Sequence, residues 1–384
     1  MSEPHAAHPA ARRWTVLLPV AGLVVLAGCG LVLLGLSTAR VGIVAEVVGV
    51  GAALLPVGPV VAAFLWMDRW EPEPARLLWL AFGWGACVAT VAALLINNTA
   101  EAVGDLLLGK GNGDKVSAVV SAPLFEEALK GAFVLGIFLF LRSEFDGVVD
   151  GIVYSGFVAA GFAFTENIYY FGRAFAEHGF GDSTSPGVVA AFILRGVLSP
   201  FTHPLFTAMI GIGIGIAAHS ASRRTWILAP LGGYLAAVVL HALWNGSATL
   251  GTATTFLTVY FLVMVPLFAA VLVFINWHRK REQRIVAAAL PAMVEINCVV
   301  VSEVELLSSL TGRRKWRRQV RSTSGKLAAR AVSEYHSAVT ELAFFRHAID
   351  RGTSGPHPQL REGHLIEAVR LRRAAAVEAA GSGR

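Results

Sequence analysis

The chain has 384 residues, of which 55% are hydrophobic and 15% are charged, with a mean hydropathy of +0.61 and a formal net charge of +6. This composition is typical of a protein that crosses a membrane several times, and it excludes a soluble globular protein. From Trp277 onward, 19 Lys and Arg residues stand against 10 Asp and Glu. The basic character therefore belongs to this tail, and it does not indicate nucleic-acid binding.

Apolar runs of about 20 residues, the length that crosses a bilayer as a helix, recur up to residue 276. The first follows Arg12 and Arg13 as a signal peptide would, but it is long and lacks a clear small-x-small cleavage site, so we expect a retained helix. The predicted fold is all-α, with a short N-terminal segment 1–14 and a polytopic transmembrane helical bundle over 15–276. We count about eight spans: 15–37, 42–67, 76–96, 117–141, 147–171, 188–218, 226–248 and 254–276.

Basic residues mark every second connection between these spans. Lys and Arg in short loops are held on the cytoplasmic side. The marked connections contain Arg12 and Arg13, Arg69 and Arg76, Arg142, Arg223 and Arg224, and the run from Arg279 to Arg284. We therefore expect a multi-pass protein of the plasma membrane with both termini in the cytoplasm.

The tail, 277–384, is predicted to be a largely helical cytoplasmic region. Apolar positions recur at helical spacing in 326–351, where Gly352 would end the helix, and again in 362–379, with a linker over 352–361 between them. The basic block 313–318 is consistent with binding of anionic lipid head groups and equally with a solvated helix end. Cys29, Cys87 and Cys298 follow no ligand or disulfide spacing, so we expect buried apolar residues.

The most informative residues are Glu126, Glu127 and Lys130, which lie inside the predicted span 117–141. An ionisable side chain at membrane depth costs about 2.5–3.5 kcal/mol on insertion scales, so such residues are rare and suggest a functional site. An ion pair that only stabilises helix packing is the alternative for Glu126 with Lys130.

Three further spans also contain polar groups, namely Glu166 with Asn167, His203, and His241 with Asn245. Residues four apart, such as His241 and Asn245, lie on one helical face. From the rise of about 1.5 Å per residue, all these groups fall in the middle-to-outer half of the bilayer. We therefore expect four helices to direct polar faces at one cavity, although either histidine alone could be a simple helix-to-helix hydrogen bond.

Carboxylates and imidazoles in a cavity of low dielectric constant suit hydrolysis of a peptide bond. Such a reaction needs a base for water, a donor to the oxyanion and an acid for the leaving amine. Glu126, Glu127 and Lys130 could divide these tasks. The same residue types could bind Zn²⁺, most plausibly through Glu127, His203 and His241. No His-Glu-x-x-His motif is present, so the spacing does not demand a metal, and a glutamate-type enzyme needs none.

Several of these motifs, in this order, resemble the PrsW family of intramembrane proteases, which belongs to a clan with the CAAX prenyl endopeptidases. The resemblance covers about residues 55 to 276. The motifs are Asp68–Pro74, Ala122–Lys130, Asp150–Tyr154, Gly161–Asn167, Arg195 ahead of His203, Gly211-x-Gly213-x-Gly215 and His241–Asn245.

This resemblance implies that Glu126 and Glu127 form the core catalytic pair, to which Glu166, His203 and His241 contribute from neighbouring helices. Lys130, Asn167 and Asn245 would then have supporting roles. It further implies site-1 cleavage of a membrane-anchored protein such as an anti-sigma factor, by a metalloprotease or by glutamate catalysis. The basic tail lies outside the family core.

Two other classes of function remain open on the residues alone. A proton-coupled transporter or channel also uses Glu, His and Lys inside a bundle, but the sequence contains no paired half-sequences of the inverted-repeat kind. A non-catalytic membrane scaffold would bind a partner through the tail, and it would lose function on deletion of 277–384 but not on Glu126→Ala.

Overall fold

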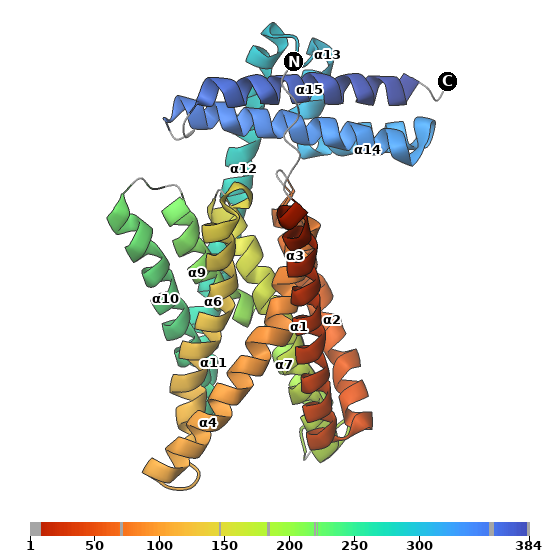
Figure 1. Ribbon diagram of the computed structural model, residues 1–384. Coiled ribbons are helices and arrows are strands. Elements are labelled where there is room, and N and C mark those ends of the chain that lie inside the picture. Colours follow the sequence, from red (N-terminus) through yellow and green to blue (C-terminus); the bar gives the residue numbers. More distant parts are fainter. Residues whose placement is uncertain are drawn as a thin grey trace. The chain divides into compact units, whose positions relative to one another are not determined.

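The computed structural model describes residues 9–69, 72–145, 147–182, 185–218, 220, 222–352 and 357–381, and only the backbone of residues 9–20 and Ser143. The described residues form helices and no strand, which confirms the predicted all-α class (Figure 1). Contacts divide the chain into two compact units. Unit 1 comprises Met1–Trp66 and Glu73–Phe268, and unit 2 comprises Met67–Pro72 and Ala269–Arg384.

Seven helices among the described residues are long and apolar enough to cross a membrane. Several of them join shorter elements end to end, because one-turn π-helical segments (η) interrupt the α-helical hydrogen bonding without ending the helix. They are α1 (Pro9–Val41), α2 (Ile43–Met67), α3 (Ala75–Gly83) with η1 (Trp84–Ala89) and α4 (Thr90–Leu108), α7 (Val148–His178), α8 (Val188–Phe192) with η4 (Ile193–Leu198) and α9 (Thr202–Ala218), α10 (Arg223–Thr249), and α11 (Ala253–Val259) with η5 (Tyr260–Met264) and α12 (Val265–Glu295).

The remaining predicted span, 117–141, is also a helix. It consists of α5 (Gly113–Val116), η2 (Ser117–Ser121) and α6 (Ala122–Phe140), and the short 3₁₀ turn η3 (Arg142–Glu144) follows it. Glu126, Glu127 and Lys130 in its middle keep it out of the seven apolar helices, although it is long enough to cross a membrane. These charges are the feature that the sequence singles out.

Two predicted spans differ from the structure in ways that affect the site. The helix predicted to end at residue 96 continues to Leu108, because the polar residues after Ile96 are followed by further helix formers. The predicted span 188–218 is interrupted at Ser199–Phe201. Pro200 explains the break, since proline disfavours the α conformation in the residue before it, and Ser199 has φ −128° and ψ 35°.

Helices α7 and α9 pack closely because glycines face each other along their seam. A Cβ atom on Gly151 would lie 2.1 Å from the carbonyl oxygen of Gly211, and one on Gly211 would lie 2.0 Å from that of Gly151. Only residues without a side chain allow this approach. The seam places the N-terminal part of α9 beside the middle of α7.

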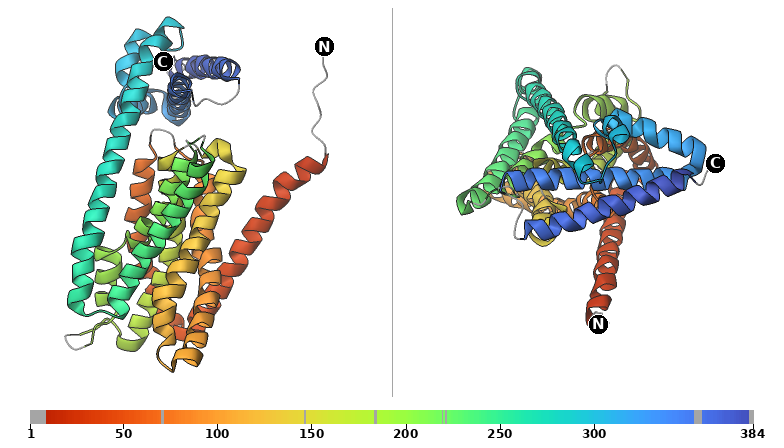
Figure 2. Two further views of the ribbon diagram at one scale, coloured as in Figure 1. Left: turned by 90° about the vertical axis from the view of Figure 1, so that its left-hand side faces the viewer. Right: turned by 90° about the horizontal axis from the view of Figure 1, so that it is seen from above.

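One end of unit 1 gathers the start of α3, the end of α6 and the starts of α7 and α10. The Tyr154 hydroxyl donates to Glu73 at 2.5 Å, and the rings of Phe138 and Trp226 lie 6.0 Å apart. The Arg142 guanidinium lies 5.0 Å from the centre of the Phe138 ring, and Arg76 and Arg223 follow or precede Glu73 and Trp226 by three residues. The sequence predicts that these three arginines share one side of the membrane. Figure 2 (left) shows α1 leaving the other helices of unit 1 at an angle.

Unit 2 is built from the later part of α12 with α13 (Val301–Leu307), α14 (Leu310–Asp350) and α15 (Pro358–Gly381). Helices α14 and α15 run side by side (Figure 2, right). The predicted helix 326–351 is confirmed as the second part of α14, after a kink at Gly325, and Gly352 has φ +68° at its end. The second tail helix begins at Pro358 rather than at residue 362, and part of the predicted linker, 353–356, lies outside the described residues.

This unit has its own apolar core, which includes Leu290, Cys298 and Val339. Of the basic block 313–318, Arg313 is buried in this unit, where its guanidinium donates to the backbone oxygens of Leu307 and His336 and to Thr340 Oγ1. Arg314, Lys315, Arg317 and Arg318 are exposed. The cysteines are all free, but only Cys298 is buried, whereas Cys29 and Cys87 are partly exposed.

Candidate functional site

Helix α6 directs Glu126, Glu127 and Lys130 into the interior of unit 1. Lys130 lies four residues after Glu126 and three after Glu127, so it neighbours both on the helix surface, and all three are buried, with exposed fractions of 5%, 0% and 0%. Pro123, which directly follows η2 within the continuous helix, has no N–H to donate to the preceding turn. Three ionisable side chains thus enter the core of the bundle from a single helix turn.

Glu127 has all its carboxylate oxygens engaged. Its Oε1 accepts from Lys130 Nζ at 2.6 Å and from His241 Nδ1 at 2.9 Å, and its Oε2 accepts from Thr207 Oγ1 at 2.9 Å. A buried ion pair is tolerated when further hydrogen bonds satisfy its remaining atoms, and that condition is met here. Glu127 is therefore a fixed anchor that joins α6, α9 and α10.

The bond to Glu127 also sets the state of His241. A carboxylate only accepts hydrogen bonds, so Nδ1 carries the proton, and in the neutral ring Nε2 then presents a lone pair. This Nε2 lies 3.9 Å from Glu126 Oε2. Glu126 Oε2 is itself buried and has no hydrogen-bond partner in the described part of the chain. Two electron-rich atoms therefore face each other.

His203 is also hydrogen-bonded to a carboxylate, that of Glu166 on α7. Its Nε2 donates to Glu166 Oε2 at 2.9 Å, and its Nδ1 is turned inward, 3.3 Å from Lys130 Nζ. Arg195, on η4, donates to the same Glu166 oxygen at 2.6 Å and, through Nε, to Asn167 Oδ1 at 2.7 Å. The break before α9 brings His203 to this position at the start of that helix.

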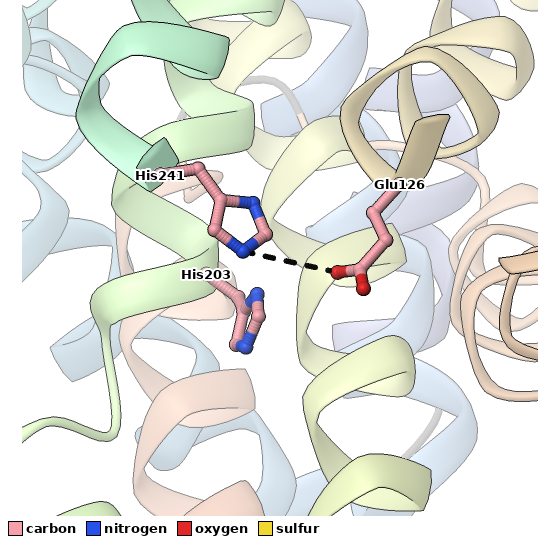
Figure 3. A group of neighbouring side chains, drawn as sticks. All are labelled: Glu126, His203 and His241. Carbon is pink, nitrogen blue, oxygen red and sulfur yellow. Dashed lines mark ion pairs between the residues drawn. The ribbon is translucent and has the colours of Figure 1, made fainter. Parts of the chain in front are cut away.

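Glu126, His203 and His241 point toward one another (Figure 3), and one donor atom from each lies within 4.8 Å of the others. Two imidazoles and a carboxylate are the ligands of a common class of catalytic zinc site, which keeps a fourth position open. A carboxylate behind each histidine is the usual outer partner of a metal-binding imidazole. The donor set, with a Glu126 Oε2 that accepts no hydrogen bond among the described residues, therefore fits a divalent cation. The acidic residue of the set is Glu126, whereas the sequence predicts Glu127.

A further residue, Asn97 on α4, was not predicted from the sequence. Its Nδ2 donates to Glu126 Oε1 at 3.1 Å, and its Oδ1 accepts from Ser121 Oγ at 2.8 Å. The predicted span 76–96 ends one residue before Asn97, so this residue lies outside the predicted spans. Extending the predicted helix through Thr99 and Ala100, as α4 does, includes Asn97.

The structure brings together every predicted site residue except that Asn245 stays at the edge. Asn245 Nδ2 donates to the carbonyl oxygen of Ala118, within η2. This bond joins α10 to the π-helical turn. Asn167 contacts the cluster only through Arg195. The catalytic and supporting roles of these residues stay predictions.

Fold and site together define a polytopic helical membrane protein with a buried carboxylate–histidine cluster of the kind that hydrolases use. The sequence model of a family described as "PrsW family intramembrane metalloprotease" matches residues 73–271. Three curated relatives, each named Protease PrsW, are similar to the chain. That of Geobacillus kaustophilus is 30% identical over 47% of this chain and 71% of its own length. The Bacillus subtilis protein is 28% identical over 46% of this chain and 73% of its own length. The Clostridioides difficile protein is 29% identical over 50% of this chain and 76% of its own length.

No solved structure matches the chain. The family match covers more than half of the chain, and it includes all the residues of the cluster. The chain belongs to the PrsW family of intramembrane proteases. It is accordingly a multi-pass membrane peptidase, which favours the predicted protease over a transporter or a scaffold.

Proposed function

We propose that this protein is an endopeptidase that hydrolyses a peptide bond of a membrane-anchored protein at the cluster of Glu126, His203 and His241. One observation supports this proposal above the others. Two carboxylates, Glu127 and Glu166, hold one nitrogen of each histidine, and one donor atom each of Glu126, His203 and His241 lies within 4.8 Å of the others. Such an arrangement suits activation of one water molecule.

In this proposal Glu126 accepts the proton of the attacking water and later returns it to the leaving amine. Lys130, whose ammonium lies 3.8 Å from Glu126 Oε2, would stabilise the negative charge that develops on the scissile carbonyl oxygen. Glu127, Glu166 and Arg195 hold the two rings and do not touch the substrate. Asn167 and Asn245 support the surrounding helices.

Metal dependence is the second candidate, favoured by the donor set described above. Glu126, His203 and His241 would hold Zn²⁺, which when bound would polarise the scissile carbonyl and make water more acidic. The catalytic type is distinguished by metal analysis of the purified protein and by treatment with a chelator. Loss of activity on chelation, with recovery on adding Zn²⁺, indicates a metalloprotease, whereas unchanged activity indicates glutamate catalysis.

The function is tested by comparing protein termini in cells that contain the wild-type protein or Glu126→Gln. Termini of membrane-anchored proteins that vanish in the variant are products of the reaction, and they identify the substrate. Glu46→Gln is the matched control, because Glu46 is another buried glutamate of unit 1, bonded to Thr38 and remote in sequence from the cluster. An unchanged set of termini in Glu126→Gln contradicts the proposal.

The resemblance further implies that the substrate is like an anti-sigma factor and that cleavage occurs near the outer face of the plasma membrane, with both termini of the enzyme in the cytoplasm. Labelling of single cysteines placed at Lys110 and at Arg223 tests the orientation. Reagents confined to the outside should modify only the first. The reverse pattern would place the start of α10 outside and contradict the predicted orientation.

We also propose that the tail contacts anionic lipid head groups through Arg314, Lys315, Arg317 and Arg318. These four side chains are exposed on α14, whereas Arg313 is buried and takes no part. Each basic residue near a charged membrane surface contributes about 1 kcal/mol.

A further inference from the structure

Asn97 is a polar side chain in a helix that is otherwise apolar enough to cross a membrane. Its neighbour Asn98 is exposed, but Asn97 is partly buried and turned toward α6. The Asn97 side chain donates a hydrogen bond to Glu126.

A carboxylate has two oxygens, and a hydrogen bond to one of them fixes where the other points. Asn97 Nδ2 binds Glu126 Oε1 at 3.1 Å, so that Oε2 faces His241 Nε2 at 3.9 Å. Among the described residues, no other hydrogen bond to the Glu126 side chain is found. Lys130 is near Oε2 but at 3.8 Å, beyond hydrogen-bond distance.

The orientation of the Asn97 amide is fixed in turn by η2. Ser121 Oγ donates to Asn97 Oδ1 at 2.8 Å, and Ser117 Oγ approaches the Asn97 backbone oxygen at 3.2 Å. A flipped amide would place its oxygen against the Glu126 carboxylate, which can only accept hydrogen bonds. The amide therefore has one favourable orientation, in which its nitrogen faces Glu126.

We infer that Asn97, locked by Ser121, is a positioning residue that holds Glu126 with Oε2 directed at the two histidines. This inference rests on the proposed function of the cluster. Asn97 acts through Glu126 and does not itself touch the reacting atoms. Outer partners of this kind typically affect activity or metal affinity by about 10- to 100-fold.

The test uses Asn97→Asp and Asn97→Leu in the full-length protein, in membranes that contain the substrate identified by its lost terminus. Aspartate keeps the shape of asparagine and can still accept from Ser121, but when ionised it has no donor for Glu126 and adds a negative charge beside it. We expect both variants to form product about 10- to 100-fold more slowly at neutral pH. Asn98→Leu, the same change as Asn97→Leu at the exposed neighbour, adds no charge to the membrane-spanning helix and should retain the wild-type rate.

The dependence on pH separates positioning from a merely structural role. A protonated aspartate regains an O–H donor, so the rate of Asn97→Asp relative to wild type should recover as the pH is lowered, whereas that of Asn97→Leu should not. Ser121→Ala should give a smaller loss that is independent of pH. Titration with Zn²⁺ alone gives a second readout, in which Asn97→Leu should bind Zn²⁺ about 10- to 100-fold more weakly if the cluster holds the cation.

Two results would overturn the inference, provided that Glu126→Gln is inactive. One is a wild-type rate of product formation by Asn97→Asp at neutral pH, and the other is the same pH dependence for the aspartate and leucine variants. Product formation that persists in Glu126→Gln would overturn the proposed function itself and, with it, any catalytic reason for this position. Protein levels in the membrane and melting temperatures, measured for every variant, identify any that fail to fold.

Discussion

At the scale of single residues, the adjacent glutamates of α6 have opposite environments. Glu127 accepts three hydrogen bonds, including one from the buried Lys130, whereas one oxygen of Glu126 accepts no hydrogen bond from the described residues. Adjacent residues on a helix point about 100° apart, so the chain brings one carboxylate to α9 and α10 and the other to α4. Their substitution should therefore have different consequences.

We expect Glu127→Gln to lower the free energy of unfolding by about 3–5 kcal/mol, because it removes the carboxylate 2.6 Å from the buried Lys130 ammonium and leaves only Glu126, at 3.8 Å, to balance that charge. Glu126→Gln should change stability far less, since its oxygen can still accept from Asn97. Thermal unfolding of the purified variants measures both. Equal losses of stability would show that Glu127 is not the anchor described here.

Arg195 gives a second prediction at this scale. One guanidinium donates to both Glu166 and Asn167, a fork that a lysine ammonium does not reproduce. Arg195→Lys should lower kcat/KM by about 10- to 100-fold through a misplaced His203. Arg173→Lys is the control, because Arg173 also pairs with a glutamate of α7, Glu177, but on the exposed surface. A loss of similar size in both variants would contradict a specific role for Arg195.

At the scale of helices, the site depends on interruptions of regular structure and on one close seam. In the π-helical turn η2, Ser117 and Ser121 donate to Asn97, and the Ala118 carbonyl accepts from Asn245. The break at Ser199–Phe201 starts α9 next to the cluster. The glycine seam between α7 and α9 then sets the distance from His203 to Glu166.

Substitution in the seam should separate those two helices. Gly211→Ala would place a Cβ atom 2.0 Å from the backbone oxygen of Gly151, which cannot move without shifting α7. Overpacking costs about 1–3 kcal/mol, and we also expect loss of product formation because the bond between His203 and Glu166 lengthens. Gly136→Ala, on α6, meets no atom within 4 Å and serves as the control. Full activity of Gly211→Ala would show that the seam does not position the site.

At the scale of the whole molecule, the tail is a second folding unit with a core of its own. Burial, with the nearby cations Arg313 and Arg317, lowers the pKa of His336 to about 3. The ring is neutral in the folded tail, but in the unfolded chain it takes up a proton below about pH 6.5. The stability of unit 2 should therefore be highest above pH 6.5, and it should fall by about 1.4 kcal/mol for each unit of pH from there toward about pH 3.

Hydrogen exchange of α14 in the full-length protein, corrected for the intrinsic effect of pH, measures this loss. His336→Leu should remove much of the acid sensitivity, whereas His364→Leu, at an exposed histidine of α15, should retain it. Acid sensitivity that persists unchanged in His336→Leu would assign it to other groups.

The lipid contact of the tail is tested on the full-length protein in nanodiscs of neutral lipid and in nanodiscs with phosphatidylglycerol. Exchange at Arg314–Arg318 should slow only with the anionic lipid, and replacing the four exposed basic residues by Gln should abolish that difference. Added salt should weaken the protection, because charge interactions at a surface are screened. Equal exchange in both lipids would favour the solvated helix end.

The sequence by itself determined the class of fold, the division into apolar helices and a basic helical tail, and most members of the cluster. Apolar length and charge placement are local properties of a chain, so Glu126, Glu127, Lys130, His203 and His241 could be recognised where they interrupt apolar runs. The tertiary structure alone decided which of them meet. Only the packing of helices distant in sequence shows that Glu127 bonds to His241 while Glu126 faces the histidines, and that Arg195 bonds to Glu166. The same packing adds Asn97 to the site. The physical reason is that hydrogen bonds between helices depend on how each helix is rotated and where it is broken.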